Sequence, residues 1–190
     1  QYEHVEVETW VESVMRLFTE RNFLVRNADD GRIYGYARSI WAMIDTSTRH
    51  PADLLALNDG DILNYVLSPE EKSCPIAKHG KIRVKADEPS RTVSTYYSDV
   101  DINGHINSVK YIEHILDLFP RQRFENSTIH RFEIAYKAEA YMGDTLTFFV
   151  STDDAGTQME IRKGVGSDTH PHGETVVQAK IEWQSVHQKE

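Results

Sequence analysis

The stretch from Ser98 to Tyr111, S-D-V-D-I-N-G-H-I-N-S-V-K-Y, carries polar side chains whose types and spacing could do chemistry. One candidate chemistry is calcium binding, because acidic and amide side chains alternate from Asp99 to a turn glycine, as in an EF-hand loop. Such a loop also needs a carboxylate with two ligating oxygens at its twelfth position. The twelfth position from Asp99 is Lys110, a cation, so the spacing argues against a calcium site.

A second candidate chemistry is acid–base catalysis by polar residues that alternate at the start of a predicted helix. They are Asp101, Asn103, His105 and Asn107. Helix capping is one interpretation, because Asp and Asn side chains accept hydrogen bonds from free amides of a first turn, but it accounts for only one or two of the four. In an extended segment, alternate residues would instead share one face. They would then project together beside a helix N-terminus, whose amides can bind an oxyanion.

Hydrophobic periodicity predicts the elements that would hold these residues. Period-two patterns indicate strands over 4–14, 18–25, 33–44, 145–152, 158–163 and 174–186. A helical pattern over 106–119 places these apolar residues on one face: Ile106, Val109, Ile112, Leu116 and Phe119. Pro120 is expected to end that helix. The polar loop that contains His170 and His172 is expected to lie in solvent.

An internal duplication relates the two ends of the chain. The pattern A-x-x-x-W occurs at 37–41 and again at 179–183, an offset of 142 (179 − 37), and Gly31 and Gly173 share that offset. The helix of the second copy would have its counterpart before Gln1. Because an antiparallel sheet needs something to cover its apolar face, we expect further sequence upstream.

Composition sets the outer bounds. The chain has 190 residues, of which 39% are hydrophobic and 27% charged, as in ordinary globular proteins, and no apolar run approaches a membrane span. Cys74 is the only cysteine, so an internal disulfide is excluded and a reducing, cytoplasmic compartment is expected. The net charge of −9 argues against nonspecific nucleic-acid binding. The histidines show no metal-ligand spacing, so neither a metal nor another cofactor is expected.

The segment from Tyr97 to Ile112 resembles the D-x-N-x-H-x-N-x-x-x-Y signature of fatty acyl-[acyl carrier protein] thioesterases. The first half resembles the N-terminal repeat of the same family over 21–25, 37–43 and 48–49. The resemblance implies an α+β fold of two tandem hot-dog repeats, in which an antiparallel sheet wraps a long helix. The first repeat, over 1–50, would lack its leading strand and helix here. A crossover linker would cover 51–90, and the second, catalytic repeat 91–190.

The resemblance also implies site residues. Asp101, Asn103 and His105 would be catalytic, together with Glu139 from a strand over 132–140, and the amides near Asn107 would stabilise an oxyanion. Plant members carry a cysteine directly after this glutamate, but here that residue is alanine, which removes a thiol nucleophile. Water or a carboxylate would then attack the thioester carbonyl. Pairing of the two acids would raise the pKa of one toward the working range, and which of them acts stays open.

The substrate implied by the resemblance is a fatty acyl chain on acyl carrier protein, and hydrolysis would release the free fatty acid and end elongation. Docking of that acidic protein would use basic residues, and the chain offers two groups: Lys78, Lys81, Arg83 and Lys85, and Arg121, Arg123, Arg131 and Lys137. A homodimer is a further expectation. Two alternatives remain: an acyl-CoA thioesterase on the same fold, and a non-enzymatic acyl-binding hot-dog module, for which the four polar site residues would have no use.

Overall fold

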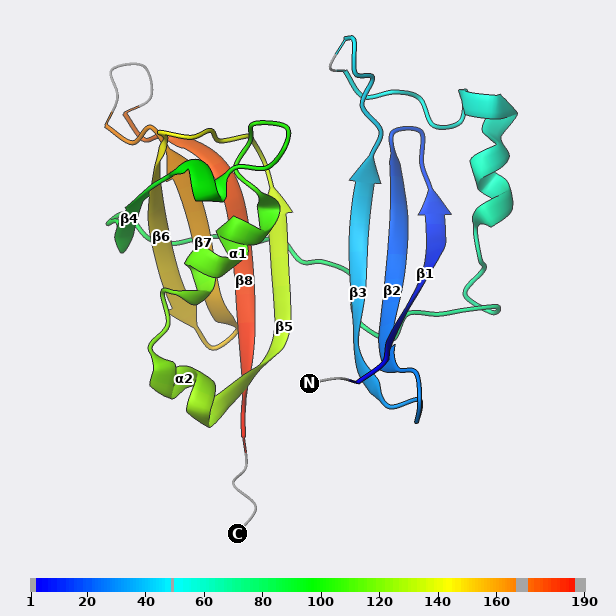
Figure 1. Ribbon diagram of the computed structural model, residues 1–190, viewed down its shortest axis with the longest axis horizontal. Coiled ribbons are helices and arrows are strands. Elements are labelled where there is room, and N and C mark those ends of the chain that lie inside the picture. Colours follow the sequence, from blue (N-terminus) through cyan, green and yellow to red (C-terminus); the bar gives the residue numbers. More distant parts are fainter. Residues whose placement is uncertain (1–2, 49, 167–170, 187–190) are drawn as a thin grey trace. The chain divides into compact units, whose positions relative to one another are not determined.

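The computed structural model describes residues 3–48, 50–166 and 171–186. Arg49 and His170, which entered the sequence analysis, lie outside the described residues. The chain divides into two compact units, Gln1–Gly80 and Lys81–Glu190, and each is described by itself (Figure 1). Within the described ranges, no helix is both long and apolar enough to cross a membrane.

The first unit is built on a three-stranded antiparallel sheet in the order β1-β2-β3. The strands are β1 (Val5–Val14), β2 (Phe18–Asn27) and β3 (Ile33–Ala42), which confirms the three strands predicted there. Asn27 shapes the turn between β2 and β3, because its Oδ1 accepts the amides of Asp29 at 2.8 Å and Asp30 at 3.2 Å. The period-two pattern of β2 therefore ends at an Asx turn.

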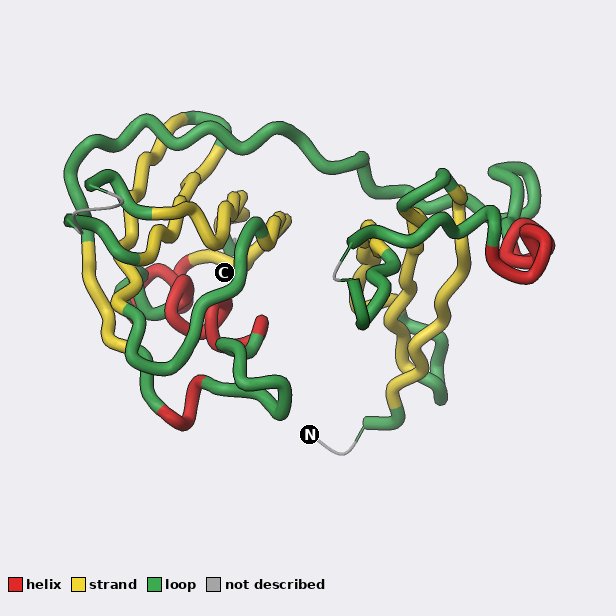
Figure 2. The backbone as a smooth tube through the Cα atoms, turned by 90° about the horizontal axis from the view of Figure 1, so that it is seen from above, coloured by secondary structure: helices red, strands yellow, loops and turns green. Residues whose placement is uncertain are grey.

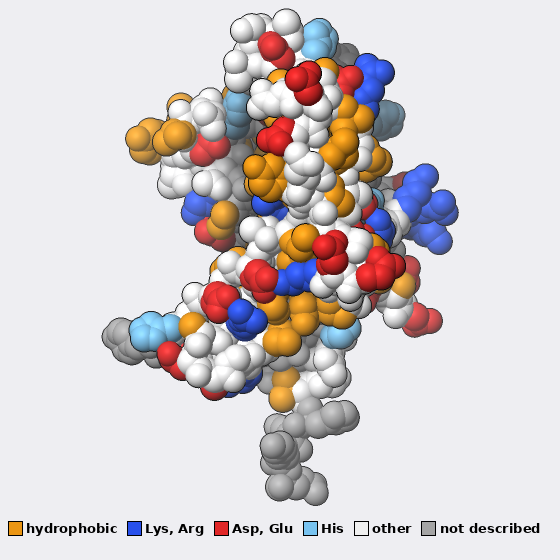
Figure 3. All heavy atoms as spheres, turned by 90° about the vertical axis from the view of Figure 1, so that its right-hand side faces the viewer, with side chains coloured by type: hydrophobic (Ala, Val, Ile, Leu, Met, Phe, Trp, Pro, Cys, Tyr) orange, Lys and Arg blue, Asp and Glu red, His pale blue; other side chains and the backbone are white. Residues whose placement is uncertain are grey.

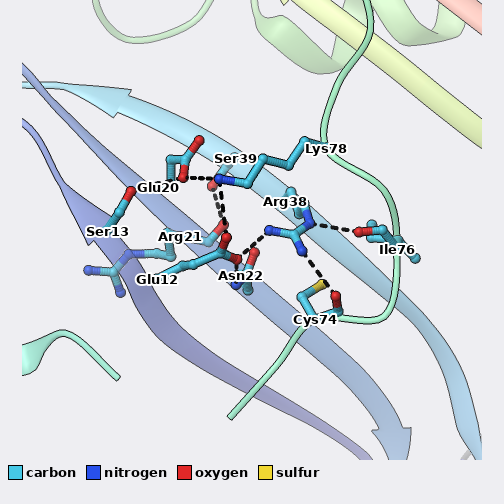
Figure 4. A network of polar contacts seen from close by, with 10 residues as sticks. All are labelled: Glu12, Ser13, Glu20, Arg21, Asn22, Arg38, Ser39, Cys74, Ile76 and Lys78. Atoms are coloured by element: carbon cyan, nitrogen blue, oxygen red, sulfur yellow. Dashed lines mark hydrogen bonds and ion pairs between the residues drawn. The ribbon is translucent and has the colours of Figure 1, made fainter. Parts of the chain in front are cut away.

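One face of this sheet is polar and holds the segment that follows it in the chain. Arg38 on β3 donates from Nε to the carbonyl of Ile76 (2.9 Å) and from Nη2 to the carbonyl of Cys74 (3.0 Å). Its Nη1 pairs with Glu12 of β1. Asn22, which is fully buried, donates from Nδ2 to the same carboxylate at 2.7 Å (Figure 4). One guanidinium thus ties two strands of the sheet to the segment that crosses them.

Lys78 extends this cluster. Its Nζ donates to Glu20 Oε2 at 2.7 Å and lies 3.3 Å from Glu12 Oε1 (Figure 4). These contacts lower the pKa of Glu20, chiefly through the Lys78 hydrogen bond, and that of Glu12, chiefly through the hydrogen bond from Asn22. The cluster is called the Glu12 network below, and its members are Glu12, Glu20, Asn22, Arg38 and Lys78.

The opposite face of the sheet carries apolar side chains that reach solvent, among them Val5, Val7 and Trp41. A 3₁₀ segment, η1 (Leu57–Tyr65), lies near β1 and adds further exposed apolar side chains. Figure 3, in which the η1 side of the first unit faces the viewer, shows such side chains at the surface among acidic ones. A hollow of about 230 Å³ lies between η1 and the end of β3.

The second unit contains a five-stranded antiparallel sheet in the order β4-β6-β7-β8-β5. The strands are β4 (Arg91–Ser94), β5 (Ser127–Tyr136), β6 (Thr145–Asp153), β7 (Gly156–Lys163) and β8 (Glu174–Ser185). Its helical elements are η2 (Tyr97–Asp99), α1 (Ser108–Leu116) and α2 (Arg121–Asn126). Helix α1 lies against one face of the sheet (Figures 1 and 2).

The core of the second unit forms between α1 and this sheet. Tyr111 and Ile115, one helical turn apart, are buried. They pack with fully buried strand residues, which include Leu146, Phe148, Met159, Ile161, Val177, Ala179 and Ile181. The predicted helix is confirmed but shorter than 106–119. The expectation that Val109 lies on the apolar face of the helix is wrong, because the buried stripe runs through Tyr111 and leaves Val109 exposed.

The two sheets share the turn that the duplication predicted. Gly31 before β3 and Gly173 before β8 both adopt positive φ, +75° and +73°. At Gly173 a Cβ atom would lie only 2.8 Å from the carbonyl oxygen of Lys163, so this turn requires glycine on two counts. The repeated A-x-x-x-W pattern falls within β3 and β8, which each follow one of these turns.

Candidate active site

A tight hairpin carries Asp101 and His105. The Gly104 amide donates to the Asp101 carbonyl (3.1 Å), and the Asp101 amide donates to the His105 carbonyl (2.9 Å). Gly104 has a φ of +83°, a left-handed conformation that glycine adopts without steric cost and that closes three-residue hairpin loops. The glycine that resembled a calcium-loop turn therefore closes a hairpin.

This turn occupies the carboxylate of Asp101. Its Oδ1 accepts the backbone amides of Asn103 (2.8 Å) and His105 (3.3 Å). The pKa of Asp101 lies below its ordinary value of 3.8, chiefly because the Asn103 amide donates to the charged form. One expectation is therefore wrong: the polar residues do not alternate on one extended face, because the chain reverses after Asp101. The sequence left open which of the two acids would have a raised pKa, and that of Asp101 is lowered.

Glu139 follows the end of β5. It was expected on a strand over 132–140, but β5 ends at Tyr136 and Glu139 lies in the loop beyond it. The ladder with β8 stops there because the next two amides both donate to the single carbonyl of Val176, at 2.8 and 3.4 Å. The assignment of Glu139 to a strand is wrong for that reason.

The loop after β5 meets the hairpin through the backbone, at one end of the second unit (Figure 1). The Ile106 amide donates to the Ala140 carbonyl (2.8 Å), and His105 pairs with Tyr141 as an antiparallel bridge. This pairing places the Glu139 carboxylate beside the His105 ring, with 3.4 Å between His105 Nε2 and Glu139 Oε2.

His105 and Glu139 are in contact at the candidate site and are called the reactive pair below, after the role expected of them. Their side chains are 26% and 45% exposed, so both are reachable from solvent while the imidazole is largely held by protein. A carboxylate beside an imidazole can exchange protons near neutral pH. The contact joins Glu139 to His105, and a close approach of Glu139 to Asp101 stays a prediction. The hairpin site is the name used below for Asp101, Asn103, His105 and Glu139.

Asn107 is the N-cap of α1. Its Oδ1 accepts the amide of Val109 at 2.9 Å, which is the capping role that the sequence left open. Its own amide donates to the carbonyl of Asp99 (2.8 Å). The cap thus takes one of the first-turn amides, and any oxyanion would have to use others. Asn103 lies exposed at the tip of the hairpin.

Sequence reasoning missed two residues that contact Glu139. Tyr141 donates from its hydroxyl to Glu139 Oε2 at 3.0 Å, and its ring lies edge-on to that of His105, with centroids 5.2 Å apart. Lys163, the last residue of β7, donates from Nζ to the Glu139 carbonyl at 2.5 Å. The only sequence signal for Tyr141 is its place two residues after Glu139, which acquires meaning once the loop is placed.

Asp99 and His114 anchor α1 beside the hairpin. Asp99 is buried, its Oδ2 accepts the Tyr96 amide at 2.7 Å, and its Oδ1 lies 3.6 Å from His114 Nε2. His114 lies on α1, so this contact ties the helix to η2, which leads into the hairpin.

Three of the basic residues considered for docking form ion pairs within the protein. Lys78 belongs to the Glu12 network, and Arg131 Nε pairs with Glu133 at 2.6 Å. Arg121 pairs with Glu125 at 2.7 Å on the exposed surface of α2. The candidates that lie exposed in the second unit are Lys81, Arg83, Lys85, Arg121, Arg123 and Lys137.

Comparison with known proteins gives matches over both units. The acyl-ACP thioesterase N-terminal domain matches residues 2–56, and the acyl-ACP thioesterase C-terminal domain matches residues 83–185. The chain belongs to the acyl-ACP thioesterase family. Its fold is accordingly α+β, in tandem hot-dog repeats, as the resemblance implied. A crystal structure of an acyl-ACP thioesterase from Bacteroides thetaiotaomicron superimposes with a TM-score of 0.84 at 45% identity, covering 97% of this chain and 70% of that one.

Plant members of the family are more distant. A dodecanoyl-[acyl-carrier-protein] hydrolase of Cinnamomum camphora is 30% identical over 185 residues, which cover 94% of this chain and 47% of the relative. A palmitoyl-acyl carrier protein thioesterase of Gossypium hirsutum is 25% identical over 194 residues, 97% of this chain and 46% of the relative. The chain therefore spans just under half the length of these plant relatives.

Proposed function

We propose that the protein hydrolyses the thioester of fatty acyl-[acyl carrier protein] and releases the free fatty acid. The observation that carries this proposal is the 3.4 Å contact between Glu139 and His105, a residue of the signature segment, in a chain of that family. The pair can move a proton and is exposed enough to meet a thioester carbonyl. Relatives named for this reaction support the substrate class.

In the proposed reaction Glu139 acts as the general base. Its carboxylate takes a proton from water while the water oxygen bonds to the thioester carbonyl carbon. The tetrahedral intermediate then collapses, the carbon–sulfur bond breaks, and the proton passes through His105 to the departing sulfur. One water is consumed, and a carboxylic acid and a thiol are formed. Asp101 is the poorer base, because backbone donors keep its pKa low.

The remaining residues of the hairpin site have supporting roles. Asp101 holds the hairpin closed through the two backbone amides that it accepts. Asn103, exposed at the tip, would orient the substrate carbonyl or the water. Asn107 would act on the oxyanion indirectly, by fixing the start of α1.

Partner, compartment and organisation are part of the same proposal. Acyl carrier protein would dock through the exposed basic residues of the second unit, with Arg83, Lys85 and Lys137 as the first to test. A cytoplasmic location is proposed from the single cysteine. Two further points stay predictions: that residues 51–90 form a linker, and that the protein forms a homodimer. Light scattering on the purified protein tests for the homodimer.

The test is a comparison of substrates with the full-length protein. A thiol-reactive dye would follow release from acyl carrier protein and from CoA carrying the same acyl chain. We expect hydrolysis of both, with kcat/KM at least about tenfold higher for the carrier-protein thioester. A preference for CoA would favour the acyl-CoA alternative. Binding of the acyl chain without turnover would favour the non-enzymatic module.

A further inference from the structure

Tyr141 contacts both members of the reactive pair. Its hydroxyl donates to Glu139 Oε2 at 3.0 Å, and its ring meets that of His105 at an interplanar angle of 82°. The same Glu139 oxygen lies 3.4 Å from His105 Nε2. A phenol and an imidazole therefore converge on one carboxylate oxygen, which limits rotation of the carboxylate about its last bonds.

The backbone of Tyr141 is fixed from two sides. Its amide donates to Asp144 Oδ2 (2.8 Å), and its carbonyl accepts the hydroxyl of Thr95 (2.8 Å). Thr95 follows β4 and Asp144 precedes β6, and these strands pair with one another. The bridge to His105 adds a third anchor. Tyr141 is thus a point in the loop whose position the sheet determines.

Lys163, on β7, contacts both Glu139 and Tyr141. Its Nζ donates to the Glu139 carbonyl at 2.5 Å, lies 3.2 Å from Glu174 Oε2, and sits 5.7 Å from the centroid of the Tyr141 ring. A cation at that distance is attracted by the ring face. The backbone of Glu139 is therefore held by Lys163 while its carboxylate is held by Tyr141.

An exposed tyrosine without a role would keep several rotamers, because ordering a side chain costs conformational entropy. Tyr141 is 46% exposed, yet each of its parts has a partner. The hydroxyl contacts Glu139, the ring contacts His105, and the backbone is bonded to Thr95 and Asp144. Its orientation is therefore set by these contacts rather than by burial.

We propose that Tyr141 is a positioning residue for thioester hydrolysis: its hydroxyl holds the Glu139 carboxylate against His105, in the orientation that accepts a proton from water. This inference rests on the proposed function. Tyr141 acts through Glu139 and has no bond to make or break in the reaction. Its loss should therefore lower kcat, by misorienting the base, and leave KM nearly unchanged.

The test begins with Tyr141→Phe, which removes the hydroxyl and keeps the ring. We expect kcat on acyl carrier protein thioester to fall about tenfold, with KM within about twofold. Tyr136→Phe is the matched control, because Tyr136 is 49% exposed and its hydroxyl donates to a backbone carbonyl, that of Ser108, at 3.2 Å. The control should stay within about twofold of the natural protein.

A double-mutant cycle separates positioning from a general structural effect. In a Glu139→Gln background, Tyr141→Phe should change the residual rate by less than about twofold, because the group that it orients is gone. An equal loss in both backgrounds would overturn the inference, and so would full activity of Tyr141→Phe. A melting temperature lowered by more than about 5 °C in Tyr141→Phe would count for a structural role and against positioning. If the natural protein hydrolyses no thioester, the proposed function and this inference both fall, whereas an active protein indifferent to Tyr141→Phe rejects the inference alone.

Discussion

The Glu12 network of the first unit and the hairpin site of the second unit both place carboxylates beside nitrogen bases, but the bases differ. In the Glu12 network the partners are Arg38 and Lys78, cations that stay charged at any physiological pH, and the pKa values of Glu12 and Glu20 are lowered. In the hairpin site the partner of Glu139 is His105, whose imidazole, unlike a guanidinium or ammonium group, is a side chain that can serve as an acid or a base in catalysis.

The two clusters also differ in exposure: the side chains of the Glu12–Arg38 pair are more covered than that of Glu139. The side chains of Glu12 and Arg38 are 18% and 20% exposed, and the network holds a crossing segment by its backbone carbonyls. Glu139 is 45% exposed and lies in a loop beyond the end of a strand. A cluster with fixed charges and covered carboxylates stabilises structure, whereas a cluster with a titratable partner and an open carboxylate can turn over substrate. We therefore propose a stabilising role for the first cluster and the chemistry for the second.

The largest effect should come from breaking the reactive pair. His105→Ala and Glu139→Gln should each lower kcat for acyl carrier protein thioester by at least about a hundredfold, the lower range for loss of a general acid or base. The double variant should be little worse than the poorer single one, because groups that act as a unit are not additive. Multiplying losses would mean that the two residues act in separate steps.

Breaking the Glu12 network should cost stability instead. Arg38→Met removes one ion pair and two hydrogen bonds to carbonyls. It leaves the Glu12 carboxylate with Asn22 and Lys78 as partners. We expect the free energy of unfolding to fall by about 2 kcal/mol, less than for a fully buried pair. Urea denaturation measures the change. A loss below about 0.5 kcal/mol would place this pair among ordinary surface ion pairs.

Acid should act on the same network. Because the pKa values of Glu12 and Glu20 are lowered in the folded protein, their contribution to stability is fully present above the ordinary value of 4.5 and is lost as pH falls through the folded values. The melting temperature should therefore drop less between pH 6 and about pH 3.5 in Glu12→Gln than in the natural protein. Equal drops in both proteins would contradict the assignment.

The smallest effect is expected from the thiol. Cys74 lies in the segment that Arg38 holds, with its carbonyl as the acceptor, and no thiol takes part in the proposed chemistry. Cys74→Ser and treatment with a chelator should each leave kcat within about twofold. A hundredfold loss in either experiment would refute hydrolysis by a carboxylate and a histidine.

Much of the fold could be predicted, because strand periodicity depends on local alternation of side chains. β1, β2, β3, β6, β7 and β8 all follow from it. The apolar stripe of α1 was only partly assigned, since helical spacing allows two faces and packing selected the one through Tyr111. The expected family was confirmed by the matches of its N-terminal and C-terminal domains.

The geometry of the site could be predicted less well. Polar alternation from Asp101 suggested an extended strand, but the positive φ of Gly104 and the side-chain hydrogen bonds of Asp101 make a hairpin. The contacts of Glu139 depend on where β5 ends, which is decided by pairing with β8, a strand far away in sequence. The partners of Lys78 lie in β1 and β2, so its basic neighbours in the sequence gave a misleading picture of a free patch.

The different roles of the two clusters are tested most directly by making one chemical change in each of them. Glu139→Gln and Glu12→Gln each replace a carboxylate by an amide of nearly the same volume, and kcat and melting temperature would be measured for both in the full-length protein. We expect Glu139→Gln to lose at least about a hundredfold in kcat, with its melting temperature within about 2 °C of the natural protein. We expect Glu12→Gln to keep kcat within about twofold and to melt about 5 °C lower. The reverse outcome, an active Glu139→Gln beside an inactive Glu12→Gln, would contradict the assignment of chemistry to the hairpin site.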